Sequence, residues 1–263
     1  MRDMSESRAE EIRAGHINPA EIITKLRNGP GKWGEALESL GTGLNLHAKY
    51  LASDRENFGE IRENLNKRPG ILIANHPSPF DLCLIMPALR RSDTLLMLQQ
   101  KNFAFLKNVL GEQYVVPATS DRSELIEITG KIVRHIASGG LFIILPSAGE
   151  ELKTNELHFK SGFRHIVSRI DPSNMVYVFD IDPTIGQTLT SQILGAPNGP
   201  EDKPLQIAPG VHVRPLKDPL EIKVNEYCTD ASEWQSIISA ARGSSGAAQN
   251  ELLTKHFLEK SAF

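Results

Sequence analysis

The feature that most constrains the fold is a series of short apolar runs that begins after residue 57. Turn-forming or charged residues bound each run: 71–74, 94–98, 114–116, 141–145 and 175–179. Segments of helical length and spacing separate the runs, notably 82–91 and 123–140. Buried strands that alternate with helices are typical of a sheet covered on both faces. The sequence therefore predicts an α/β fold with a mixed, mostly parallel sheet flanked by helices.

The chain before these runs has a different pattern. Residues 1–56 are polar and helical in character, and Asn18 followed by Pro19 is a helix-start signal, with Asn as the cap and Pro in the first turn. Helical spacing continues through LNLHAKYLA, residues 44–52. We therefore expect an N-terminal helical appendage over residues 1–56 and an α/β domain over residues 57–263.

The last third of the chain divides into three parts. Residues 184–219 are rich in Gly, Pro and Thr, which predicts a long loop. EIKVNEY, residues 221–227, alternates between apolar and polar side chains and predicts a late strand. From Ala231 onward the spacing is helical, with an interruption at residues 243–246.

Composition excludes several classes of protein. A formal net charge of −3 gives no attraction to nucleic acid, so none is expected as a partner. Two cysteines, Cys83 and Cys228, are too few and too far apart for a disulfide scaffold or a zinc site, which favours a reducing cytoplasm. The first residues lack the apolar core of a secretory signal. No apolar run approaches the ~20 residues that span a bilayer, so any membrane contact is expected to be peripheral.

The sharpest chemical signal is ILIANHPSPFD, residues 71–81. An apolar strand runs into Asn75 and His76, and Asp81 follows five residues after the His. Open α/β sheets place their chemistry at the carboxyl ends of strands. Two prolines prevent helix directly after the His, so the chain must turn before the next helix starts near Asp81. Such a turn can bring the Asp81 carboxylate onto one imidazole nitrogen.

An Asp partner would prepare His76 for proton transfer. It fixes the tautomer, favours the imidazolium that forms on proton uptake, and leaves the other nitrogen to act as a general base. On spacing alone, the better explanation is a strand-end His that is satisfied by a helix-capping Asp. The strand before His76 and the motifs downstream favour the catalytic interpretation.

Four stretches, in order, resemble the blocks of the glycerolipid acyltransferases, the glycerol-3-phosphate and lysophosphatidic acid acyltransferase family. Residues 62–81 are similar to the first block, a strand that ends in N-H-x-x-x-x-D. Residues 96–124 resemble the second block. Residues 141–153 resemble the third block, and residues 158–167 resemble the helix start that follows it. Residues 176–183 lie where the family has its fourth block. The downstream positions that match are Lys101, Gly111, Pro117, Asp121, Arg122, Ser123, Phe159, Gly162 and Arg164.

The resemblance implies an O-acyltransferase of phospholipid biosynthesis. Such an enzyme moves a fatty acyl group from acyl-CoA or acyl-carrier protein to a hydroxyl of a glycerol-phosphate-like or lysolipid acceptor. His76 would be the general base, oriented by Asp81, and no metal or bound cofactor is implied. Substrate contacts are expected from Asn75, Lys101, Arg122, Ser147, Gly149, Lys160 and Arg164.

The third block departs from the family pattern. The usual P-E-G-T-R carries an Arg that holds the acceptor phosphate, whereas residues 146–150 read P-S-A-G-E. The P-S-x-G form resembles the soluble plastid-type glycerol-3-phosphate acyltransferases, but those also continue with Arg where this chain has Glu150. A carboxylate there repels a phosphate. Either other cations supply the positive charge (Arg122, Lys153, Lys160 and Arg164), or the acceptor has no phosphate at this place.

Two other functions fit parts of the sequence. VFDIDPT, residues 178–184, matches in part the D-x-D-x-T motif of haloacid-dehalogenase-type phosphatases, with Asp180 as nucleophile and Asp182 beside it. That motif normally opens its domain, and no later paired-Asp motif follows. A non-catalytic protein with the acyltransferase fold, which binds lipid or a carrier protein, is the third option, and Glu150 favours it.

A helix over residues 101–111 could touch the membrane. Phe103, Leu106 and Leu110 share one face, with Phe105 beside it and lysines flanking. The ordinary interpretation is that this face packs against the sheet. The alternative is that part of it dips into the lipid headgroup region, so that a cytoplasmic protein binds the membrane at its surface.

Overall fold

The computed structural model describes residues 18–52, 58–147, 157–185, 191–194, 205–208, 211–241 and 245–259. Its centre is a seven-stranded sheet in the order β1-β9-β6-β2-β5-β3-β4. Strands β6, β2, β5, β3 and β4 are parallel to one another, whereas β9 runs antiparallel to β6 and is parallel to β1. The predicted mixed, mostly parallel sheet is confirmed.

Each predicted strand is present. The strands of the sheet are β1 (Leu46–Ala52), β2 (Gly70–Ala74), β3 (Thr94–Gln99), β4 (Val115–Ala118), β5 (Leu141–Ile144), β6 (Met175–Ile181) and β9 (Leu220–Asp230). β2, β5 and β6 lie side by side in the middle, and the described side chains of all three are buried. This explains why their sequences are continuous apolar runs without alternation.

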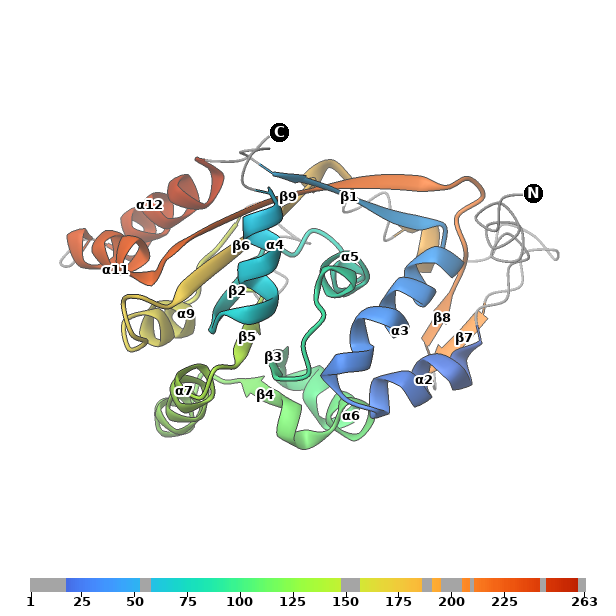
Figure 1. The fold of residues 1–263 in the computed structure, drawn as a ribbon, viewed down its shortest axis with the longest axis horizontal. Coiled ribbons are helices and arrows are strands. Elements are labelled where there is room, and N and C mark those ends of the chain that lie inside the picture. The colour runs from blue at the N-terminus through green and yellow to red at the C-terminus, as the bar shows by residue number, and fades with distance from the viewer. Residues whose placement is uncertain are drawn as a thin grey trace.

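Helices cover both faces of the sheet (Figure 1). The α-helices are α2 (Pro19–Arg27), α3 (Pro30–Gly43), α4 (Phe58–Lys67), α5 (Asp81–Ile85), α6 (Gln100–Leu110), α7 (Arg122–Ala137), α9 (Ser161–Val167), α11 (Ala231–Ala240) and α12 (Gly246–Leu258). Short 3₁₀ turns are η2 (Met86–Ala88), η3 (Glu112–Tyr114) and η4 (Pro183–Ile185). Among the residues described, no helix is long and apolar enough to cross a bilayer.

Two hydrophobic cores follow from the alternation of side chains along β2. Leu72 and Ala74 point to the face covered by α2, α3, α5 and α6. Ile71 and Ile73 point to the opposite face, covered by α7, α9, α11 and α12. Because β2 is buried from both sides, the segment that leaves its carboxyl end is held firmly in place.

The predicted N-terminal helices exist as α2 and α3. Asn18 caps α2, since its Oδ1 accepts a hydrogen bond from Glu21 N at 3.3 Å. Both helices belong to the same core as one face of the sheet. The division of the chain at residue 56 stays a prediction, and residues 1–17 and 53–57 lie outside the described part.

Two local predictions were wrong. Residues 46–52 are not helical but form the edge strand β1, parallel to β9. In this segment buried or half-buried Leu46, Ala48 and Tyr50 alternate with exposed His47 and Lys49, which is a strand period. The stretch 184–219, predicted as a loop, contains β7 (Leu205–Ala208) and β8 (Val211–Val213), which pair as a separate antiparallel ribbon.

Candidate active site

His76 and Asp81 meet at the carboxyl end of β2. His76 follows the strand after one residue, and Asp81 is the first residue of α5. His76 Nδ1 lies 2.6 Å from Asp81 Oδ2, which also accepts a hydrogen bond from Ser78 N at 3.2 Å. The Asp81 side chain is fully buried, whereas the His76 side chain is 17% exposed. A buried carboxylate thus holds one ring nitrogen of an imidazole that solvent can reach.

The electrostatics of the pair suit proton transfer. Burial raises the pKa of Asp81 to about 6, although the hydrogen bonds from His76 and from Ser78 N act in the opposite direction. At neutral pH the carboxylate is therefore mainly ionised and favours the imidazolium form of His76. Because the two groups are in contact, their protons are lost in steps that belong to the pair.

Asn75 fixes the backbone next to His76. Its Oδ1 accepts a hydrogen bond from Ile181 N at 2.7 Å, and its Nδ2 donates to Ile181 O at 2.7 Å and to Asp180 Oδ1 at 3.0 Å. These bonds extend the pairing of β2 with β6 by one residue beyond Ala74. Asn75 was predicted to contact substrate. In the structure its side chain is buried and bonded to β6, so that it positions the neighbouring His76.

The other predicted site residues follow neighbouring parallel strands. Lys101 comes just after β3, Arg122 after β4, and Ser147 after β5. Carboxyl ends of parallel strands lie at one edge of a sheet, so these residues share the edge that carries His76. Lys101 and Arg122 are exposed, which leaves them accessible to solutes.

Two of the predicted contacts lie around α9. Lys160 is exposed at the start of this helix, and its backbone N–H donates to Pro146 O at 3.2 Å. This bond ties the beginning of α9 to the segment that follows β5. Arg164 is half-buried within α9. Gly149 and the departing Glu150 lie outside the described residues.

Arg122 begins α7 and lies close to α9. Asp121 caps the helix, since its Oδ1 accepts hydrogen bonds from Glu124 N at 2.8 Å and Ser123 Oγ at 2.6 Å. Burial together with the positive charges of Arg169 and Arg122 lowers the pKa of His165 in α9. The positive charge of Arg122, at the start of α7, is therefore close enough to α9 to act on His165.

The phosphatase alternative finds no support in the geometry. Asp180, its nucleophile, is a buried residue within β6 and accepts a hydrogen bond from Asn75. Asp182 closes a turn, since its Oδ1 accepts hydrogen bonds from Thr184 N at 2.9 Å and Thr184 Oγ1 at 2.7 Å. Asp180 is thus engaged in holding β2 to β6 rather than presented as a nucleophile.

A second group of residues near α5 escaped sequence reasoning. Tyr50 in β1 donates a hydrogen bond from its hydroxyl to Leu84 O of α5 at 2.8 Å. The Arg62 guanidinium lies 4.2 Å from the centre of the Tyr50 ring, and its Nη2 is 2.7 Å from Oε1 of the fully buried Glu226 in β9. The available signal was that the alternation along β9 breaks at Asn225 and Glu226, where two polar residues are adjacent, but this does not identify the partner.

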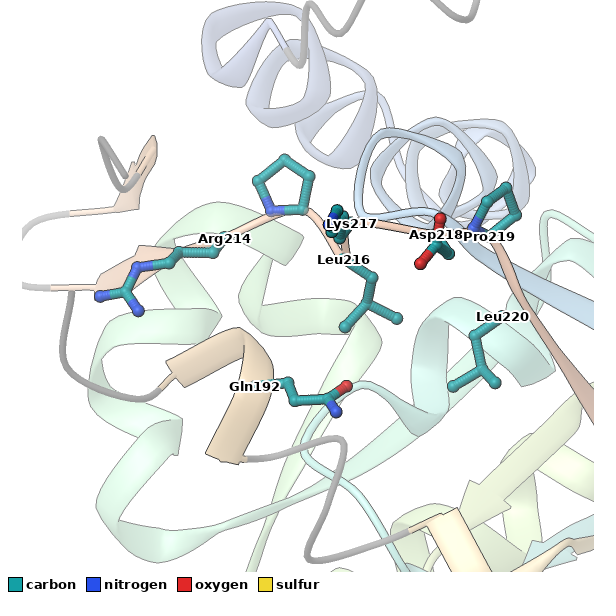
Figure 2. Close-up of a pocket in the computed structure, with 8 residues that line it drawn as sticks. Gln192, Arg214, Leu216, Lys217, Asp218, Pro219 and Leu220 are labelled. Carbon is teal, nitrogen blue, oxygen red and sulfur yellow. The ribbon is translucent and has the colours of Figure 1, made fainter. Parts of the chain in front are cut away.

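A cavity of about 560 Å³ lies between β8 and the start of β9 (Figure 2). Among the described residues, the chain over 214–220 forms most of its wall, and Gln192 from the helical turn 191–194 also lines it. This volume is within the range of small-molecule sites. Sequence reasoning missed the cavity, because it falls in the stretch predicted to be a loop.

Comparisons with known proteins agree with the geometry. Residues 58–181 match the family model described as Acyltransferase. The crystal structure of the 1-acyl-sn-glycerophosphate (LPA) acyltransferase PlsC from Thermotoga maritima is similar, with 17% identity and a TM-score of 0.52 over 100% of this chain and 85% of that chain. At this identity the likeness shows the fold alone. No curated protein matches the chain at a significant level.

The region of the family match contains the elements that build the candidate site. It begins with α4 and ends with the last residue of β6, and it includes His76, Asp81, Arg122 and Ser147. The resemblance to the acyltransferase family is thereby confirmed, and residues 58–181 are the part of the chain that matches the family model.

Proposed function

We propose that this protein moves a fatty acyl group from a thioester donor, acyl-CoA or acyl-carrier protein, to a hydroxyl of a glycerol-phosphate-like or lysolipid acceptor. The observation that carries the proposal is the 2.6 Å contact between His76 Nδ1 and the buried Asp81, within an acyltransferase domain. The pair needs no metal ion to activate a hydroxyl, because imidazole is itself a base near neutral pH.

In the proposed reaction, the acceptor hydroxyl gives its proton to Nε2 of His76 while its oxygen attacks the thioester carbonyl. A C–O bond forms, and the C–S bond breaks when the tetrahedral intermediate collapses. The imidazolium then returns the proton to the departing thiolate. Asp81 holds Nδ1 and stabilises the imidazolium throughout, so no net charge remains on the protein.

The acceptor headgroup can be tested through Arg122. Acyl transfer from acyl-CoA is measured to glycerol 3-phosphate, to lysophosphatidate and to an uncharged monoacylglycerol. If Arg122 grips a phosphate, Arg122→Ala should raise the KM of the phosphorylated acceptors by about tenfold or more, which corresponds to a charge-assisted bond of about 2 kcal/mol. The KM of the donor should change little.

Arg134, also exposed and in the last turn of α7, supplies the matched control. Arg134→Ala removes the same charge from the opposite end of the helix and should leave all constants unchanged. If the enzyme acylates only the uncharged acceptor and Arg122→Ala has no effect, the acceptor belongs to a different substrate class, one without a phosphate. A protein that transfers no acyl group to any of the three acceptors would contradict the proposed function.

Ser147 offers a second test at the same edge. Its side chain is fully buried, and its Oγ has no hydrogen-bond partner among the described residues. Because such a hydroxyl costs free energy, we expect bound substrate to supply the partner. Ser147→Ala should lower kcat/KM by about tenfold, the value of one hydrogen bond of about 1.4 kcal/mol, without lowering the melting temperature.

Ser78 is the contrasting serine. Its Oγ already accepts a hydrogen bond from Phe80 N at 3.0 Å, so Ser78→Ala should lower the melting temperature. If Ser147→Ala destabilises the protein as much as Ser78→Ala and leaves kcat/KM unchanged, the Ser147 hydroxyl is structural.

Membrane contact through α6 is a further expectation. Phe103 and Leu106 are half-buried and pack on the core, and Leu110 is buried, as the ordinary interpretation requires. Phe105 is 46% exposed, between Lys101 and Lys107. We expect Phe105→Ser to reduce sedimentation with anionic liposomes several-fold at an unchanged melting temperature, since aromatic and basic side chains favour the headgroup region.

The exposed Ile126 on α7 is the matched control, at 49% exposure. Ile126→Ser removes an equally exposed apolar side chain from another helix and should leave liposome binding intact. If both variants lose liposome binding equally, or if the unmodified protein does not bind liposomes, α6 is ruled out as the membrane contact.

A further inference from the structure

The cavity between β8 and β9 has a firmly held wall. Leu216 N donates to Leu44 O at 3.1 Å, and Leu220 N donates to Asn45 O at 2.8 Å. Asn45 adds a side-chain bond from Nδ2 to Leu216 O at 2.6 Å. At the other end of the segment, Arg214 N donates to the 191–194 turn at 3.0 Å. The cavity is therefore part of the fold rather than a gap beside a loose loop.

The cavity lies at the edge of the sheet that carries His76. β9 is antiparallel to β6 and pairs Val224 with Ile181, the last residue of β6. The start of β9, Leu220, therefore extends beyond the carboxyl end of β6. β9 is two strands from β2, a separation of about 10 Å across the sheet.

Strand order also separates the cavity from Arg122. Arg122 follows β4, which is three places from β2 on the side opposite to β9. Along the carboxyl edge, His76 thus lies between the cavity and the cations expected to hold an acceptor phosphate. Acyl transfer needs two substrates to meet at His76, and this arrangement gives each of them its own side.

The lining favours an amphipathic ligand. Leu216 and Leu220 point toward one space, and Gln192 faces them across it (Figure 2). Arg214, Lys217 and Asp218 add two cations and one anion to the wall. A fatty acyl chain needs an apolar lining, so a wall with three charged side chains and one amide fits it poorly. A ligand in which apolar and amide groups alternate and which ends in a phosphate matches this wall better than an acyl chain does.

We propose that this cavity binds the phosphopantetheine arm of the thioester donor. The arm carries methyl groups, two amides and a phosphate, which correspond to the leucines, to Gln192 and to the exposed Lys217. Donor and acceptor then approach His76 from opposite ends of the carboxyl edge. This assignment rests on the acyl transfer proposed above, and it applies to acyl-CoA and acyl-carrier protein alike because both contain the same arm.

The test changes the cavity without touching the candidate catalytic pair. Lys217→Glu reverses an exposed charge at the wall, and Gln192→Trp fills space from an exposed position. Three donors are compared: acyl-CoA, S-acyl phosphopantetheine and S-acyl pantetheine, which lacks the phosphate. Lys217→Glu should raise KM about tenfold for the first two and leave the third unchanged, since about 1.4 kcal/mol is a tenfold change. Gln192→Trp should raise KM for all three.

The controls separate this assignment from the reaction itself. Lys223→Glu makes the same charge change at an exposed position of β9 outside the cavity, and should leave every KM unaltered. The KM of the acceptor and the melting temperature should not change in any variant. Acyl-CoA and acyl-carrier protein are run in parallel, and the donor with the lower KM identifies the source of the arm.

Each outcome has a definite meaning. Active variants with unchanged donor KM would remove the donor from this cavity while leaving the acyl transfer intact. A response of S-acyl pantetheine equal to that of acyl-CoA in Lys217→Glu would overturn the phosphate contact. Titration calorimetry with CoA reports binding without turnover. Binding that Gln192→Trp abolishes, in a protein that transfers no acyl group, would support the site and contradict the proposed reaction.

Discussion

His76→Ala is expected to lower acyl transfer by about two to four orders of magnitude, the usual effect of losing a general base. The side chain lies at the end of β2 and is partly exposed, so its removal takes little from either core. The fold should therefore survive, as judged by an unchanged circular dichroism spectrum. Turnover is measured with acyl-CoA as donor, by release of the free thiol.

His47 in β1 provides the control for this substitution, because it is an exposed histidine on the edge strand, three strands from β2. His47→Ala should retain the full rate. A folded His76→Ala variant with near-normal turnover would show that His76 is not the base.

Asp81→Asn should be severe, but less so than His76→Ala. The amide keeps the shape of the carboxyl group and removes the charge that favours the imidazolium. The apparent pKa in the pH profile of kcat/KM should therefore move to lower pH than in the unmodified enzyme. A profile that keeps its position would mean that Asp81 has no electrostatic influence on His76.

The second large effect concerns the buried pair formed by Arg62 and Glu226. Burial raises the pKa of Glu226 to about 8, and Arg62 opposes this rise. The unfolded chain loses the Glu226 proton near its ordinary pKa of 4.5, whereas the folded chain keeps it up to about pH 8. Folding therefore binds a proton in this window, and this group's contribution to stability falls as pH rises from 4.5 to 8.

Arg62→Met should remove the cation that pairs with this carboxylate and keep most of the aliphatic volume. At pH 5 the folded protein holds Glu226 protonated, so Arg62→Met should lower the free energy of unfolding only slightly. At pH 9 Glu226 must either ionise without its partner or retain a proton at a cost. The free energy of unfolding should then fall by about 3–5 kcal/mol. Urea denaturation at the two pH values measures the difference.

Lys49 in β1 and Glu221 in β9 form an exposed ion pair that serves as the control, with side chains 52% and 61% exposed. Lys49→Met should cost at most about 1 kcal/mol at either pH, as solvent-exposed pairs do. If Arg62→Met costs the same at pH 5 and at pH 9, its role is packing against Tyr50 rather than charge neutralisation. The result bears on the site, because Tyr50 is hydrogen-bonded to the helix that begins at Asp81.

Local pattern was sufficient for the strands that build the site. The apolar runs at 71–74 and 141–145 are buried on both sides, so their composition alone distinguishes them from amphipathic helices. The motif around His76 was also readable, since two prolines force a turn and the strand before it aims the turn at the carboxyl edge. Even so, the roles of His76, Asp81 and the basic residues stay predictions until the variants are measured.

The hydrogen-bond partners of Asn75 could not be predicted from local sequence pattern. Its place before His76 suggested a substrate contact, but its amide groups are bonded to Ile181 and Asp180. Those partners are in β6, which is adjacent to β2 in the sheet but far away along the chain. Only strand order brings them together, and strand order is not encoded in the periodicity of any one segment.

The sequence by itself determined the α/β class, the position of six of the seven strands in the sheet and the turn that joins His76 to Asp81, because each depends on residues close together in the chain. Tertiary structure decided that residues 46–52 form a strand, that Arg62 meets Glu226, and that residues 214–220 enclose a cavity. In these three cases the hydrogen bonds, the ion partner and the cavity wall come from distant segments. The free energy of such contacts appears only once the sheet has assembled.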